Sequence, residues 1–399
     1  MRATLPVLVT TAKLTSSTVA EPFAPAAYNA GTTYALGEIV SVAADFVIYE
    51  SLAASNIGNT PGTQPLWWRK IGVTEAAYNG AATYNLGDTC SANHRTYESL
   101  AASNTGNPLP VLPETLTDYW QDVGPTMRYA MFDLSRNTQT VGPSPLTAVI
   151  AVGERINTAG LTGMRGNTLL LKATSVSAGG TIFPLAYNAT KTYAKGECMT
   201  VGMTTCYQSL QDTNVGHAAP NATWWAVVSG AIYDLNTREV FDAETYCFEP
   251  FSTRPSKTVF DIPRVTDIVV TVTLTATSGN CKIGGLTLGT NIYLGKLLKP
   301  AKNTGVSYST VSRDKYGNAT LVKRPMLPKL SGTLLLPSLH VNRVLYARNL
   351  LDAEPALYTG TDIDDDWTDA VTIMGVHQQF DVTTSDGEEA LIQFSAEEI

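Results

Sequence analysis

The chain has 399 residues, of which 44% are hydrophobic and 16% charged, so it is long enough to bury the cores of two to four domains. Its net charge of −8, without a strong basic cluster, argues against a nucleic-acid-binding surface. The sequence has no apolar run of the roughly 20 residues that a membrane span needs, and 1–6 lack the apolar core of a signal peptide. We therefore expect that the protein is made in a cytoplasm and does not insert into a membrane. The 31 glycines, 21 prolines and many threonines and serines favour β-structure.

After an expected N-terminal arm over 1–20, one motif occurs three times. Its first block, Ala-Tyr-Asn followed by Thr-Tyr and Gly-Glu or Gly-Asp, contains the tyrosine pairs Tyr28/Tyr34, Tyr78/Tyr84 and Tyr187/Tyr193. A Tyr-Glu/Gln-Ser-Leu block and an Asn-x-Gly turn follow in each copy. Each copy ends in two adjacent aromatic residues: Trp67-Trp68, Tyr119-Trp120 and Trp224-Trp225. A period of about 50 residues indicates small modules in array, here module 1 (21–73), module 2 (74–124) and module 3 (184–229).

Each module is expected to be a very small antiparallel sheet. Gly37 marks a turn that needs a permissive backbone, and the strand over 39–42 should pair with the one around Tyr49. So small a unit has little core, and a few aromatic side chains must supply most of the buried area. Because neighbouring strand residues point to opposite faces, we expect one member of each terminal pair to be buried and the other to point outward. The buried set is Trp68, Trp120 and Trp225, and the outward set is Trp67, Tyr119 and Trp224.

The repeated order Tyr-Asn, Thr-Tyr, Gly-Glu/Asp, Tyr, Asn-x-Gly and Trp resembles the small chitin- and cellulose-binding modules of carbohydrate-binding families five and twelve. The resemblance implies a bent three-stranded sheet that binds polysaccharide by stacking exposed aromatic rings on sugars. It implies these saccharide-binding residues: Trp67, Tyr119 and Trp224, with neighbouring Tyr34, Tyr84 and Tyr193. Where those families place exposed tryptophans, just after the second-strand tyrosine, this chain has Ser-Leu pairs that begin at Ser51, Ser99 and Ser209. The alternative is therefore that the modules are protein–protein spacers.

The segments on either side of module 3 are rich in predicted strands. Before the module these are 128–133, 146–152, 158–161 and 168–174, and after it 231–234, 259–262, 268–275 and 281–289. Insertions succeed at exposed loops whose ends stay close, so module 3 is expected at a hairpin tip. Residues 125–183 and 230–295 then form one discontinuous β-sandwich of about eight strands, jelly-roll-like in type.

The region 296–399 is expected to be an α+β assembly domain. A strand–turn–strand unit is centred on 316–318, and 340–351 has apolar residues at helical spacing. Further strands are expected at 331–336, 355–360, 370–376 and 391–394. The predicted fold class is mainly β: three small antiparallel modules, one of them inserted into a β-sandwich, followed by this α+β domain.

A second resemblance lies in 291–295, 308–314, 317–320, 323–324 and the segment around Arg343. These segments resemble an uncharacterised tail protein common in tailed bacteriophages. The resemblance implies a structural protein of the virion tail, tail tip or neck, assembled as a homo-oligomeric ring or trimer with other tail proteins. The modules would then touch host-surface glycans. The alternative is an accessory polysaccharide-binding protein of a secreted glycan-degrading system.

The search for catalytic chemistry finds little, and we expect no enzyme, cofactor or metal. The acidic stretch 362–369 could ligate Ca²⁺ but lacks the pattern of an EF-hand, so a solvated loop is favoured. The four histidines have no partner at metal-ligand spacing, and no Gly-x-Ser-x-Gly elbow exists. Five cysteines without metal-ligand spacing favour reduced thiols, although Cys198 and Cys206 are expected in facing strands of module 3, where a disulfide is conceivable.

Overall fold

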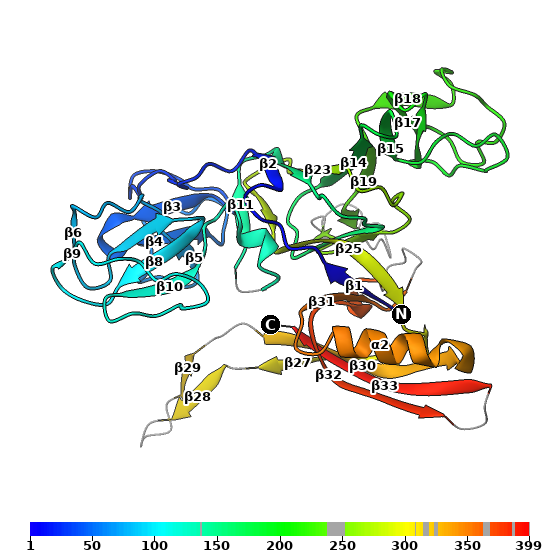
Figure 1. The fold of residues 1–399 in the computed structure, drawn as a ribbon. Helices are drawn as coiled ribbons and strands as arrows, with labels where there is room; N and C mark the ends of the chain where they lie inside the picture. The colour runs from blue at the N-terminus through cyan, green and yellow to red at the C-terminus, as the bar shows by residue number, and fades with distance from the viewer. Residues whose placement is uncertain are drawn as a thin grey trace.

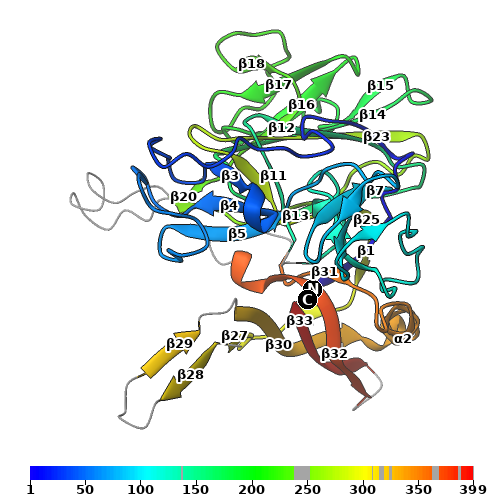
Figure 2. The same cartoon turned by 90° about the vertical axis from the view of Figure 1, so that its left-hand side faces the viewer.

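The computed structural model describes residues 1–135, 138–237, 252–307, 309–313, 319–322, 326–361, 368–384 and 388–398. It confirms the predicted fold class: the chain is mainly β, with three small modules, a central β-sandwich and a C-terminal region that carries one α-helix (Figure 1). Modules 1 and 2 lie together on one side of the sandwich, and module 3 lies apart from them (Figures 1 and 2).

The sandwich consists of two antiparallel sheets that share one core. The first sheet contains β15 (Gly180–Phe183), β14 (Thr168–Ser175), β23 (Ile268–Thr275), β12 (Leu146–Ala151) and β2 (Leu14–Ser17), with β19 (Ala231–Asp234) also on β14. The facing part of the second sheet contains β22 (Lys257–Val259), β13 (Thr158–Thr162), β25 (Gly285–Tyr293) and β1 (Arg2–Pro6). Strands β14 and β23 bury every second residue, such as Leu171 and Val272, which is the pattern of strands with one face in a core.

The N-terminal strand β1 lies in the middle of the second sheet. It pairs with β25 on one side and with β31 on the other, so Arg2 is opposite both Tyr293 and Thr359. The sheet continues through β31 (Ala356–Thr359), β32 (Thr372–Thr384), β33 (Glu389–Glu398) and β30 (Met326–Pro337), which pairs with β26 (Lys296–Leu297) and β27 (Lys302–Ser307). Residues 1–20 are therefore not a separate arm, because β1 and β2 complete both sheets. The second sheet also contains strands from before and after residue 296, so the predicted domain boundary there does not separate two sheets.

Helix α2 (Val341–Leu350) confirms the helix predicted over 340–351. Val344 and Ala347 pack with Leu334, Tyr358 and other residues into a second core over the C-terminal part of the sheet. The short helices η3 (Ser338–His340) and η4 (Asp369–Val371) precede α2 and β32. The C-terminal region is thus an α+β unit with its own core.

The strand predicted over 128–133 is wrong. The segment forms the 3-10 helix η2 (Ala130–Phe132), in which the Phe132 amide donates to the Tyr129 carbonyl at 2.9 Å. The remaining two-stranded pairs are β11 (Thr140–Gly142) with β24 (Cys281–Ile283), β20 (Asn236–Thr237) with β21 (Ser252–Thr253), and β28 (Thr310–Arg313) with β29 (Ala319–Val322). The β28–β29 hairpin projects from the body of the molecule (Figure 2). The turn predicted at 316–318 lies outside the described residues.

Each module contains a three-stranded antiparallel sheet. Module 1 has β3 (Ile39–Val42), β4 (Val47–Ser51) and β5 (Trp68–Val73), with η1 (Ala43–Asp45) between the first two. Module 2 has β7 (Thr89–Ala92), β8 (Arg95–Ser99) and β10 (Trp120–Pro125), with the short pair β6 (Thr83–Tyr84) and β9 (Asn104–Thr105). Module 3 has β16 (Cys198–Val201), β17 (Thr205–Ser209) and β18 (Trp225–Val228).

Module 3 interrupts one edge position of the sandwich. Strand β15 pairs with the C-terminal half of β14, where Ala173 faces Phe183, and β19 pairs with the N-terminal half, where Leu171 faces Ala231. The two short strands therefore lie one after the other along the same edge of β14. The chain leaves the sheet after β15, forms module 3 and returns to the same edge of β14 as β19.

Two further sequence predictions concern cysteines and membrane spans. Cys198 is opposite Gln208 in the β16–β17 pair, and Cys206 is opposite Thr200. Both are free thiols, as are Cys90 and Cys281, while Cys247 lies outside the described residues. In the described ranges, no helix has the length and apolar character needed to cross a membrane.

Candidate functional site

An aromatic triad forms the core of every module. In module 1, the Tyr28 and Tyr34 rings are stacked at 5.9 Å, and Trp68 meets Tyr34 edge-on at 5.2 Å. The same triad recurs as Tyr78, Tyr84 and Trp120, and as Tyr187, Tyr193 and Trp225. Trp68, Trp120 and Trp225 are at most 3% exposed, which confirms the predicted buried member of each terminal pair. The repeated aromatic residues thus supply the module core, as offset and edge-on rings commonly do.

The placement of Tyr34, Tyr84 and Tyr193 beside an open stacking surface is wrong. Tyr34 is 7% and Tyr193 is 2% exposed, and Tyr84 is half-buried in the same arrangement. Each hydroxyl accepts a hydrogen bond from the backbone amide five residues earlier, at 2.7 Å for Asn29 and Tyr34. Their rings pack edge-on against the tryptophan and belong to the module core. The candidate surface is reduced to Trp67, Tyr119 and Trp224.

A buried asparagine holds each of these three residues by its backbone. The Asn56 amide nitrogen donates to Ser51 Oγ at 3.0 Å and to the Trp67 carbonyl at 3.2 Å. Asn104 makes the same bonds to Ser99 and Tyr119, and Asn214 makes them to Ser209 and Trp224. The Asn-x-Gly motif predicted only a turn; the network also explains why serine and asparagine recur together. A buried amide with these partners fixes the outward residue in one orientation.

Each outward aromatic residue lies opposite a leucine. The Leu52 amide donates to the Trp67 carbonyl at 2.9 Å, next to the facing residues Ser51 and Trp68. Residues opposite each other in an antiparallel pair share a face, so Leu52 and Trp67 lie side by side, and the partly buried Trp67 also packs against the module core. We call the equivalent sets the outward pairs: Leu52–Trp67, Leu100–Tyr119 and Leu210–Trp224. Tyr119 is 43% exposed, and Trp67 and Trp224 are half-buried.

The exposed members Leu52, Leu210 and Tyr119 give each outward pair a small apolar surface. Such a surface suits a pyranose ring, whose face is apolar and whose rim carries hydroxyl groups. Of the predicted outward members, Tyr119 is exposed, whereas Trp67 and Trp224 are partly buried and pack against the cores of their modules.

Module 3 differs from the other two at one position. Asn59 and Asn107 each donate to the neighbouring buried asparagine at 2.8 Å, but His217 stands at this place in module 3. Consequently Asn214 Oδ1 is buried without a hydrogen-bond partner among the described residues. The His217 ring instead stacks on Trp224 at 3.9 Å with an interplanar angle of 10°. The outward pair of module 3 is thereby extended by an imidazole.

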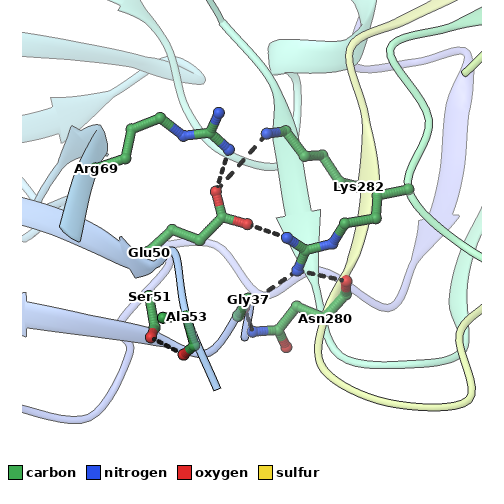
Figure 3. Close-up of polar contacts among 8 residues, drawn as sticks. Gly37, Glu50, Ser51, Ala53, Arg69, Asn280 and Lys282 are labelled. Carbon is green, nitrogen blue, oxygen red and sulfur yellow. Dashed lines mark hydrogen bonds and ion pairs between the residues drawn. The ribbon is translucent and has the colours of Figure 1, made fainter. Parts of the chain in front are cut away.

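A buried charge cluster joins module 1 to the sandwich. The carboxylate of Glu50, on β4, is fully buried and accepts hydrogen bonds from Arg69 of the same module and Arg165 of the sandwich (Figure 3). The ammonium group of Lys282, on β24, lies 3.8 Å from it. Asn280 also donates to the Gly37 carbonyl at 3.1 Å. Segments more than 100 residues apart thus meet at one carboxylate.

The cluster sets the charge states of its members. Burial by itself would raise the pKa of the Glu50 carboxyl, but Lys282, Arg165 and Arg69 outweigh burial and lower it. Burial and the two guanidinium groups lower the pKa of Lys282 to about 8, against the opposing effect of Glu50. An ionised, paired carboxylate is costly to separate from its partners in a buried site. Module 1 is therefore held in a defined orientation.

A second polar junction fastens modules 1 and 2 to the start of the sandwich. The Glu75 carboxylate, at the start of module 2, accepts hydrogen bonds from the Phe23 amide at 2.8 Å and from the Met127 amide. Glu21 accepts a hydrogen bond from the Thr126 hydroxyl at 2.6 Å, and its other oxygen lies 2.8 Å from His94 Nδ1. Burial raises the pKa of Glu75 to about 7.

The described residues contain no group of three or more histidine, cysteine, aspartate or glutamate side chains placed to hold a metal ion. Of the acidic stretch 362–369, the residues 362–367 lie outside the described part of the chain. No protein-family model matches the sequence, and no curated protein matches it significantly.

Proposed function

We propose that the chain is a non-enzymatic structural subunit of a bacteriophage virion, in the tail, tail tip or neck, whose modules bind glycans of the host surface. The observation that carries this proposal is the repetition of the outward pairs in three modules on one β-framework. The Glu50 cluster and the Glu75 junction fasten modules 1 and 2, and the two covalent connections along β14 anchor module 3. Its partners would be other tail proteins, further copies of the chain and a host glycan.

Several weak binding sites on one molecule can together bind a glycan surface firmly. Each outward pair is small, so its affinity for a single sugar is expected to be low. Linking several sites raises the overall avidity by a factor of about 10²–10⁴ when they can engage together. One subunit presents three such pairs, and a ring or trimer multiplies them again. A rigid framework keeps the pairs available without the loss of freedom that flexible linkers would impose.

Two features of the C-terminal region support assembly with neighbouring subunits. The outer side of the α2 region exposes three large apolar residues: Leu339 (86%), Tyr346 (65%) and Leu350 (42%). The β28–β29 hairpin pairs with no other described strand, and all four residues of β28 are exposed. Isolated two-stranded hairpins are marginally stable in water. Both features are expected to be covered in a homo-oligomer or against another virion protein.

The proposal is tested by locating the chain. Antibodies against the purified protein should label the tail region of intact phage particles in negative-stain images, and the purified protein should form rings or trimers. The same images distinguish the alternative function. Isolated monomers that bind chitin or cellulose, together with unlabelled particles, would identify an accessory polysaccharide-binding protein instead.

A further inference from the structure

A groove of about 540 Å³ separates module 3 from the sandwich. It lies between the turn that ends at Glu197, the module strands β16 and β17, and the sandwich strands β19 and β22. Its size is within the range of about 300–1,000 Å³ that is typical of small-molecule sites. None of its lining residues belongs to an outward pair, so it is a separate feature of the molecule.

In module 1, the sandwich covers the face that corresponds to the groove of module 3. There Arg165 and Asn280 of the sandwich bond to the Gly37 carbonyl, and a Cβ atom on Gly37 would lie 1.7 Å from the Arg165 side chain. In module 2 a Cβ atom on the equivalent Gly87 would have no described atom within 4 Å, so this face is open to solvent. In module 3 the equivalent Gly196 faces the groove. The module face around this turn glycine is therefore covered by the sandwich in module 1 and open to solvent in module 2. In module 3 the same face lines the groove.

The groove has balanced charge. Its ionisable lining residues include three lysines and three acids: Lys191, Lys195, Lys257, Glu197, Asp234 and Asp261. Lys191 and Glu197 form an ion pair at 3.1 Å, and the Lys257 ammonium lies 4.5 Å above the Tyr233 ring. A lining without net charge gives no preference for phosphate or another simple anion. It offers hydrogen-bond donors and acceptors side by side.

Two of these groups are available to a ligand. No hydrogen bond or ion pair joins the side chain of Lys195 or Asp261 to another described residue. Leu185, which is 47% exposed, and Ile232 add apolar surface to the same groove. A sugar hydroxyl can accept from an ammonium group and donate to a carboxylate at once, while the ring face contacts apolar side chains.

We infer that this groove is a second saccharide-binding site, independent of the outward pairs. Lys195 donates to a sugar hydroxyl, Asp261 accepts from another, and Leu185 contacts the ring. The turn position of Lys195 is the position of Leu36 in module 1 and Leu86 in module 2, so only module 3 carries the donor. The site is thus a property of the junction and not of the repeated module.

The test uses the full chain on an array of bacterial surface-polysaccharide fragments and N-acetylglucosamine oligomers, with calorimetry for each saccharide that binds. The double variant Lys195→Leu, Asp261→Asn restores the leucine of the other modules and removes one charged acceptor. Loss of a hydrogen bond to a charged group should weaken groove binding at least tenfold. Leu36→Lys, the reciprocal change in module 1, is the matched control and should leave binding unchanged.

A second variant keeps the test independent of the lost charges. Leu185→Trp places a large side chain at the groove mouth and should also abolish groove binding. The variant Trp67→Ala, Tyr119→Ala, Trp224→Ala removes the outward pairs but should retain the groove signal. The inference is overturned if no saccharide binds the wild-type chain, or if binding survives both groove variants. It is also overturned if binding is lost only in the outward-pair variant, which would assign all binding to those pairs.

Discussion

Arg165 of the sandwich donates to Glu50 of module 1, and the carboxylate that receives this bond is fully buried. The contact joins residues 115 positions apart and determines where the first module stands on the framework. Glu98 and Gln208 occupy the same place in modules 2 and 3 and make no such cluster with the described residues. The repeated motif therefore encodes the module, and Arg165 and Lys282, which lie outside the motif, determine how module 1 is joined to the sandwich.

Removing Arg165 should loosen this junction. Arg165→Ala leaves the buried Glu50 with Arg69 and Lys282 alone, so we expect the free energy of unfolding of module 1 to fall by about 1–3 kcal/mol. Denaturant unfolding and hydrogen exchange of the β3–β5 amides would measure it. Glu98→Gln is the matched control and should change stability by less than about 0.5 kcal/mol. Equal effects of both variants would show that the cluster does not hold the module.

His217→Asn should stabilise module 3. The asparagine of modules 1 and 2 would donate to Asn214 Oδ1, which is buried without a described partner, and a satisfied buried acceptor is worth about 1 kcal/mol. The substitution also removes the ring stacked on Trp224, so tryptophan fluorescence should change. The reciprocal Asn107→His should destabilise module 2 by a similar amount. A destabilised His217→Asn protein would mean that the ring stack outweighs the missing hydrogen bond.

The Glu75 junction should make stability depend on pH. Its folded pKa of about 7 lies above the unfolded value near 4.5, so the folded state binds more protons between these values. Stability from this group is present below about pH 4.5 and is lost as the pH rises through 7. We expect the unfolding temperature of the wild-type protein to decline over this window relative to Glu75→Gln. Glu21 and His94 face the same junction, so the comparison with Glu75→Gln isolates one group. Parallel curves for the two proteins would contradict the assignment.

The outward pairs should be required for attachment but not for folding. The variant Trp67→Ala, Tyr119→Ala, Trp224→Ala removes exposed or half-buried rings, and we expect each module to keep its buried tryptophan core. Host adsorption by particles that carry this variant should fall at least tenfold, because avidity depends on several weak sites. Leu36→Ala with Leu86→Ala removes other exposed apolar side chains from the modules and is the matched control. Unchanged adsorption would leave the modules as protein–protein spacers.

Local features follow well from the sequence. The buried Trp68 follows from strand alternation, and helix α2 follows from apolar spacing. The expectation for Tyr34 is wrong because an aromatic residue in a repeat can serve the core or a ligand, and composition does not distinguish the two.

Long-range relationships could not be predicted in the same way. The insertion of β1 between β25 and β31 depends on pairing over almost the whole chain, which no local pattern encodes. The Glu50 cluster likewise collects Arg165 and Lys282 from distant strands, and each of these residues is an ordinary surface type when seen alone. The groove beneath module 3 arises from the way two units meet and has no motif of its own.

The central claim is that this chain is a virion subunit that displays its modules outward, and cryo-electron microscopy of the intact phage particle tests it most directly. The account predicts symmetric copies of the sandwich and α+β region within the tail, with α2 and the β28–β29 hairpin covered by neighbours. It also predicts density for all three modules on the outer surface, with Trp67, Tyr119 and Trp224 facing away from the particle. A particle map that contains no copy of the chain, or copies whose modules are buried against other virion proteins, would contradict it.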